Sequence, residues 1–132
     1  MKFKIDTKEK FTVVTPIEPY FSDIVAAELG SNFNNILQKE VKNTILNLSN
    51  ITIIDKVFYD GITQWQRRFY EANASFVICE MTPKIVAVFD SLKLTDVLNI
   101  TPTESEAWDI VQMEEIERDL LDGDDFEFEK NE

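Results

Sequence analysis

The side chains that could support catalysis are few, and they form no recognisable catalytic set. The chain has one cysteine, Cys79, and no histidine. A cysteine nucleophile needs a neighbouring base, most often histidine, so we interpret Cys79 as a buried thiol within the apolar run 76–79. The acidic residues in 122–125 lack the alternating ligands and terminal glutamate of a calcium loop. We therefore expect a protein that is not an enzyme and that has no cofactor and no metal.

The stretch most informative about function follows the apolar run 51–54. This run ends at Asp55, and a helical pattern of apolar residues begins after it. We interpret Asp55 as a helix N-cap, because a carboxylate is favoured at the positive end of a helix; a functional acid is the alternative. Lys56, Val57 and Phe58 could form a surface that contacts a partner. The alternative is that Val57 or Phe58 begins the apolar stripe that packs in the core.

The charge distribution excludes several classes of partner. The formal net charge is −12, and residues 114–132 contribute −8 of it, with 10 acids against Arg118 and Lys130. Such a chain should repel nucleic acid and anionic membranes. No apolar run approaches the roughly 20 residues of a membrane span, so we expect no direct membrane insertion. The N-terminus has no apolar signal core, and one buried thiol suits a reducing compartment, so we expect a cytoplasmic protein.

Apolar periodicity predicts an α/β domain. Two alternating runs around a polar turn predict an N-terminal hairpin, and strand and helix patterns alternate after it. The expected strands are 3–7, 11–15, 44–48, 76–79 and 98–100, and the expected helices are 23–40, 56–70, 83–92 and 103–121. The fold class is therefore α/β: the hairpin, a helix, then βαβαβα, with a mostly parallel sheet, a hairpin strand at its edge and about four helices. We expect one domain over 1–121 and a disordered acidic tail over 122–132.

Local signals add detail to this fold. Two prolines within 16–19 predict an irregular connection into the first helix, which Ser22 or Asp23 can cap. Residues 76–79 form a continuous apolar run, and residues 45–48 are apolar except for Asn47, as expected of strands buried on both faces. These two strands should therefore be parallel neighbours in the centre of the sheet.

Several strings, taken in order along the chain, resemble the STAS domain, the fold of the anti-sigma-factor antagonists. Residues 46–55, LNLSNITIID, resemble a family strand that ends in L-D-L-S-x-V-x-F-I-D. Residues 79–83, CEMTP, resemble a strand followed by S-P and a helix. Residues 89–90 and 94–100 resemble the family's F-D-x-x-G-L-x-x-x-L/I segment, and residues 106–107 resemble the E-A at the start of its last helix. The resemblance spans roughly residues 3–111 and implies a protein that binds an anti-sigma factor or a serine kinase.

The chain also departs from the family pattern. After Asp55 the family's S-S-G is replaced by Lys56-Val57-Phe58, so the family's phosphorylated serine falls on Val57. Valine has no hydroxyl, and the resemblance therefore implies that phosphoserine switching does not operate here. A later family glycine falls on Lys93, where we expect a different loop. The candidate partner-binding residues are this segment and the two positions that match an acid of the family's first helix: Ser22, Asp23, Asp55, Lys56, Val57 and Phe58.

The leading hypothesis is a non-enzymatic protein-interaction module that resembles an anti-sigma-factor antagonist and lacks phosphoserine switching. The alternative is a STAS-type structural subunit of a transporter or other regulatory assembly. A third class, binding of a small molecule or nucleotide at the carboxyl end of the sheet, follows only from a general tendency of α/β folds. Ile116, Leu120 and Leu121 extend an apolar stripe beyond the matched region. They could pack on the chain's own body, or cover a partner or a second copy in a homodimer.

Overall fold

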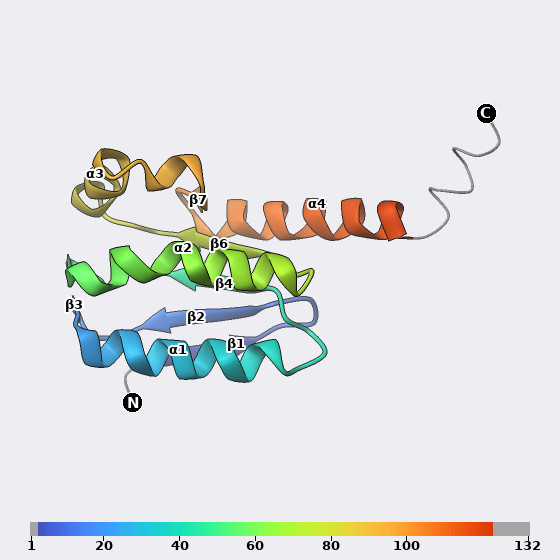
Figure 1. Ribbon diagram of the computed structural model, residues 1–132, viewed down its shortest axis with the longest axis horizontal. Coiled ribbons are helices and arrows are strands. Elements are labelled where there is room, and N and C mark those ends of the chain that lie inside the picture. Colours follow the sequence, from blue (N-terminus) through green and yellow to red (C-terminus); the bar gives the residue numbers. More distant parts are fainter. Residues whose placement is uncertain (1–2, 123–132) are drawn as a thin grey trace.

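The computed structural model describes residues 3–122 of the 132-residue chain, apart from the side chains of Val57 and Asp122. A five-stranded sheet lies at its centre in the order β1-β2-β4-β6-β7, and β3 pairs with β5 in a separate two-stranded sheet (Figure 1). The strands are β1 (Phe3–Thr7), β2 (Thr12–Pro16), β3 (Tyr20–Phe21), β4 (Thr44–Asn47), β5 (Ile53–Ile54), β6 (Phe76–Cys79) and β7 (Asn99–Thr101). The helices are α1 (Asp23–Leu37), α2 (Lys56–Glu71), α3 (Pro83–Ser91) and α4 (Glu104–Asp122), with a 3₁₀ turn η1 (Leu94–Asp96) before β7.

The topology confirms the predicted α/β fold. β1 and β2 form the antiparallel N-terminal hairpin, and β2, β4, β6 and β7 run parallel. β4 and β6 are parallel neighbours, as expected, with Ile45 beside Val77 and Leu46 beside Ile78. α1 ends at Leu37, three residues before its predicted end. The predicted tail lies outside the described residues except for Asp122, whose backbone continues α4.

Side-chain alternation along the central strands builds a core on each face of the sheet. Leu46 and Ile78 belong to a large core shared with α1, α2 and α3. Ile45 and Val77 belong to a smaller core, which Ala107 and Val111 of α4 cover on the other face. Three helices therefore hold one face, and α4 alone packs on the other.

Aromatic packing joins α1 and α2 to the sheet. The Phe33 ring of α1 makes edge contacts with Trp65 and Phe69 of α2 and with Phe76 of β6, at centroid distances of 5.1, 5.5 and 5.3 Å. Phe69 stacks on Phe76 at 5.0 Å. Each such ring contributes roughly 1.5–3 kcal/mol by burial, so α2 is held firmly along its length.

None of the helices within residues 3–122 is both long enough and apolar enough to cross a lipid bilayer.

Candidate functional site

The pairing of β3 with β5 creates the surface of greatest functional interest. Tyr20 lies beside Ile53, and Phe21 beside Ile54, in parallel register. The Asp55 amide extends this pairing by donating to the Phe21 carbonyl at 2.8 Å. Because β3 leads into α1 and β5 leads into α2, the pairing sets the amino ends of the two helices side by side at the carboxyl end of the sheet (Figure 1).

Hydrogen bonds fix the beginning of α1 and the segment before α2. The Ser22 hydroxyl accepts from the Val25 amide at 3.2 Å and caps α1, as predicted. Asp23 is exposed in the first turn, where the helix dipole favours an acid. The Tyr20 hydroxyl donates to Oδ2 of Asp55 at 3.3 Å, and the carboxylate charge of Asp55 raises the pKa of Tyr20. The predicted N-cap role of Asp55 fits its place directly before Lys56, the first residue of α2.

Phe58 lies in the hydrophobic core beneath this surface. It is buried, and the centroid of its ring lies 4.6 Å from that of Phe21 and 6.3 Å from that of Phe89. A partner therefore cannot reach Phe58 as it reaches the exposed Lys56, and we leave Phe58 out of the contact surface. The side chain of Val57, another predicted contact, lies outside the described part of the chain.

Exposed apolar side chains surround these polar groups. Tyr20, Ile24 and Ile53 are large hydrophobic residues that remain exposed. We use the name β3–β5 surface for this set together with the polar residues between them: Tyr20, Ser22, Asp23, Ile24, Ile53, Asp55 and Lys56. Sequence reasoning placed four of these seven residues, and it missed the three apolar ones.

Two hollows border the β3–β5 surface. One, of about 240 Å³, lies between α1 and α2, and its lining includes Asp23, Gly61 and Trp65. The other, of about 290 Å³, lies between β5 and α3, and its lining includes Ile53 and Lys84. Each has room for a side chain from another molecule. The surface thus offers apolar contacts, charges of both signs and two recesses, which are features of a protein interface.

Cys79 has the buried position predicted for it. Its side chain is fully enclosed beneath α4, and burial, together with the charges of Glu104 and Glu80, raises its pKa to about 12. The thiol therefore stays protonated near neutral pH, where a nucleophile would need the thiolate.

The known proteins place this architecture in a family. The family model for the STAS domain matches residues 2–107. The chain belongs to the STAS domain family. This match includes β3, β5 and the whole of α2, so the β3–β5 surface lies inside the STAS domain, whereas most of α4 follows it. No curated protein sequence matches the chain significantly.

Solved STAS structures share the fold. A crystal structure from Thermotoga maritima, described as an anti-sigma-factor antagonist, is 21% identical, covers 83% of this chain and 94% of its own, and has a TM-score of 0.71. The phosphorylated Bacillus cell fate determinant SpoIIAA is 17% identical, with coverages of 83% and 98% and a TM-score of 0.63. The murine anion transporter Slc26a9 is 11% identical, and the match covers 79% of this chain and 18% of the transporter, with a TM-score of 0.63.

The position of the family's later glycine has an unusual backbone conformation in this chain. Lys93, which occupies it, has φ of 61° and ψ of 25°, in the left-handed region that favours glycine. The lysine therefore adopts a backbone conformation that suits glycine, and the expected difference from the family's loop stays a prediction. Left-handed geometry costs a residue with a Cβ roughly 1–2 kcal/mol, which burial of Leu94 in η1 and of Leu98 just after it helps to offset.

Proposed function

We propose that this STAS domain is a non-enzymatic protein-interaction module of the anti-sigma-factor-antagonist type. The observation that carries the proposal is the β3–β5 surface, in which exposed apolar residues surround the adjoining amino ends of α1 and α2. Its partner would be an anti-sigma factor or a serine kinase, as the family resemblance implies. We place the partner contacts at Ser22, Asp23, Asp55 and Lys56, together with Tyr20, Ile24 and Ile53.

The charge of the surface supports a partner with complementary charge. Asp23 and Asp55 contribute negative charge near the exposed ring of Tyr20, and Lys56 adds a single positive charge beside them. A chain with a formal net charge of −12 attracts a basic partner and accelerates its association. The exposed isoleucines would then supply the apolar centre of the interface.

We also propose that this surface is always competent to bind. The family's phosphorylated serine falls on Val57, which cannot accept a phosphate. A phosphate would add about −1.5 to −2 charges at the start of α2, whereas here Lys56 places a positive charge there. Incubation of the wild-type chain with ATP and a cognate serine kinase should therefore leave residues 55–58 unmodified, as measured by mass spectrometry. A phosphate found on this segment would contradict the proposal.

Substitution of the surface tests the binding function. A tagged wild-type chain would capture its partner from native lysate, and the identified partner would then be purified for titration. Lys56→Glu and Ile53→Ser should each weaken binding by more than about tenfold, equivalent to about 1.4 kcal/mol. Lys39→Glu makes the same charge change at an exposed position just beyond α1, and it should bind within about twofold of wild type. If both surface variants fold and bind normally, the contact surface lies elsewhere.

The second candidate is a STAS-type structural subunit of a transporter or other assembly. The likeness to part of the Slc26a9 anion transporter favours it. The captured partner separates the two hypotheses, because an anti-sigma factor or kinase supports the first and a membrane transporter supports the second.

A further inference from the structure

The C-terminal half of α4 exposes an apolar stripe that no described part of the chain covers. Met113, Ile116 and Leu120 are 57%, 60% and 55% exposed. At 100° per residue they fall within one narrow arc of the helix, and this arc is opposite the side that carries the buried Val111. The three residues, which we call the α4 stripe, therefore face away from the body. Of the three residues that the sequence left without an assigned contact, Ile116 and Leu120 therefore do not pack on the described part of the chain.

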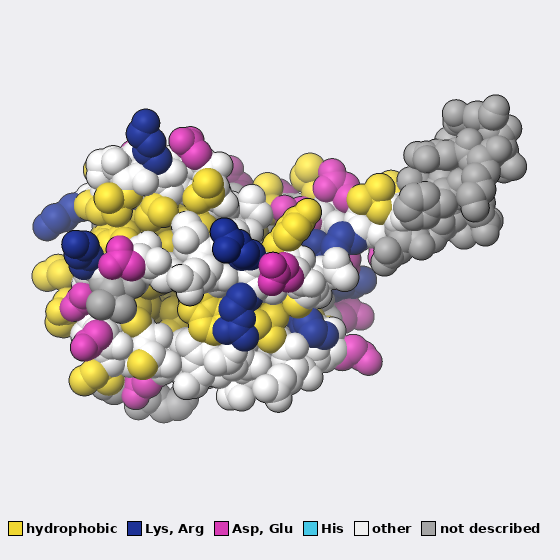
Figure 2. Space-filling view, in the orientation of Figure 1, with side chains coloured by type: hydrophobic (Ala, Val, Ile, Leu, Met, Phe, Trp, Pro, Cys, Tyr) yellow, Lys and Arg dark blue, Asp and Glu magenta, His cyan; other side chains and the backbone are white. Residues whose placement is uncertain are grey.

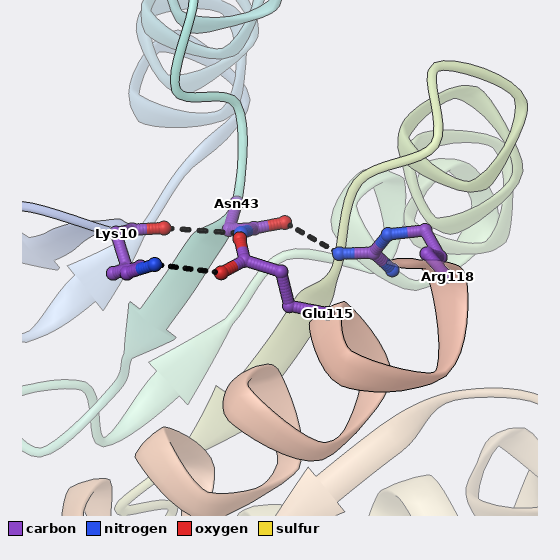
Figure 3. Close-up of polar contacts among 4 residues, drawn as sticks. All are labelled: Lys10, Asn43, Glu115 and Arg118. Atoms are coloured by element: carbon purple, nitrogen blue, oxygen red, sulfur yellow. Dashed lines mark hydrogen bonds and ion pairs between the residues drawn. The ribbon is translucent and has the colours of Figure 1, made fainter. Parts of the chain in front are cut away.

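The opposite side of α4 is anchored by polar contacts, which Figure 3 shows in part. Asn43 donates from Nδ2 to Oε2 of Glu115 at 2.9 Å, and its Oδ1 accepts from Arg118 at 3.2 Å. Lys10 forms an ion pair with Glu115 at 3.5 Å. The buried Ser75 donates to Oε1 of Glu114 at 2.6 Å. These bonds fix the rotation of the helix, so the α4 stripe cannot turn inward without breaking them.

Acidic residues border the α4 stripe on both sides. Glu117 and Asp119 are exposed, one on each side of the stripe, and Asp109 is exposed in line with it, about one turn before Met113. Figure 2 shows hydrophobic and acidic side chains side by side where α4 projects from the body. Between residues 106 and 122 the helix has seven acids and one base, Arg118, a net charge of −6.

This charge pattern identifies the kind of partner. A second copy packed on the α4 stripe would bring carboxylates against carboxylates, and like charges at an interface oppose association. A helix with an apolar face and lysine or arginine along its borders complements both the stripe and its acidic edges. We propose that the α4 stripe is a docking site for a cationic amphipathic helix of a partner protein. It lies beyond the residues of the family match and at the opposite end of the molecule from the β3–β5 surface (Figure 1).

A model peptide tests this proposal on the full chain. The probe is a synthetic, fluorescently labelled helix of about five turns with leucine on one face and lysine on the other. Two controls have the same length: a scrambled peptide of the same composition, and one with glutamate in place of lysine. Fluorescence anisotropy should detect binding of the probe and of neither control peptide. The affinity for the probe should fall as the salt concentration rises, because screening reduces its attraction to the acidic border.

Matched variants assign the binding to the α4 stripe. Ile116→Ser combined with Leu120→Ser should weaken probe binding by at least about tenfold. The control combines Leu92→Ser with Val97→Ser, whose side chains are similarly exposed, at 51% and 59%, but lie around η1. This control should bind within about twofold of wild type, and so should Lys56→Glu, which makes the test independent of the β3–β5 surface. The proposal would be overturned if the stripe variant bound the probe as tightly as wild type does. It would also be overturned if the control variant lost as much affinity for the probe as the stripe variant.

Other occupants of the stripe give different results. A wild-type dimer in sedimentation that becomes a monomer in the stripe variant would assign the stripe to a second copy and overturn the proposal. Probe binding that tightens at least about tenfold when residues 123–132 are deleted would assign it to the chain's own tail, and would also overturn it.

Discussion

The β3–β5 surface and the α4 stripe both expose large apolar residues, but different kinds of contact hold the two surfaces in place. Beneath the β3–β5 surface lie Phe21 and Phe58, in the core that three helices share. Beneath the C-terminal half of α4 lie Asn43 and Ser75, and both accept hydrogen bonds from Arg118 of the helix. The first surface is therefore held by apolar burial, and the second by polar contacts.

This difference means that the two surfaces should respond to different perturbations. Burial is non-directional and depends on volume, so the β3–β5 surface should be sensitive to loss of core atoms. Hydrogen bonds depend on each partner being present, so the α4 stripe should be sensitive to removal of a single polar group. Mutations can therefore loosen one surface while leaving the other in place.

The largest effect is expected from Phe58→Ala. The substitution leaves a cavity next to Phe21 and Phe89 and should reduce the free energy of unfolding by about 3–5 kcal/mol. Urea denaturation measures it. Tyr70→Ala, which removes an aromatic ring that is 76% exposed on the same helix, should change stability by less than about 0.5 kcal/mol. A similar loss in both variants would show that Phe58 does not support the β3–β5 surface through burial.

A smaller effect is expected from Asn43→Ala. The buried Ser75 amide, which donates to Oδ1 of Asn43 at 2.8 Å, would lose its partner, and Glu115 and Arg118 would each lose a bond. The expected loss of stability is about 2 kcal/mol. Amide hydrogen exchange should accelerate in residues 113–122 more than in α2.

The control for this prediction is Asn32→Ala, because the Asn32 side chain bonds only to the Glu28 carbonyl one turn earlier in α1 among the contacts within residues 3–122. It should lose less than about 0.5 kcal/mol. If Asn43→Ala accelerates exchange equally throughout the molecule, the polar contacts do not anchor α4 separately from the rest of the fold.

The smallest effect is a difference between two helical glycines. A Cβ at Gly61 would meet nothing within 4 Å, so Gly61→Ala should stabilise the protein by about 1 kcal/mol. A Cβ at Gly30 would lie 3.2 Å from the Trp65 ring, which is held by Phe33 and Arg68, so Gly30→Ala should gain less or lose stability. Thermal unfolding measures both. Equal gains would mean that α1 and α2 separate easily beside the β3–β5 surface.

The sequence predicted the features that depend on neighbouring residues. Short apolar runs identified β4 and β6 as neighbouring parallel strands, and Ser22 was one of the two residues expected to cap the first helix. Each signal lies within a few residues of the feature that it predicts, which is why pattern and propensity were sufficient.

Features that depend on distant residues could not be predicted in this way. β3 and β5 have two residues each, too few to show a period of two, and their pairing joins segments more than 30 positions apart. The contacts of Asn43 reach both Lys10 and Arg118, and nothing in the sequence near 43 indicates either. The buried position of Phe58 was one of two alternatives in the sequence, and only packing against Phe89 decides between them.

Mapping the partner on the chain tests the central claim most directly. The ¹⁵N-labelled wild-type chain would be titrated with the purified partner while amide chemical shifts are recorded. We expect the shifted or broadened amides to cluster at residues 20–24 and 52–56, because β3 and β5 bring these two segments into one surface. Shifts confined to the C-terminal end of α1, to η1 or to the β1–β2 turn would contradict the claim that the β3–β5 surface binds the partner.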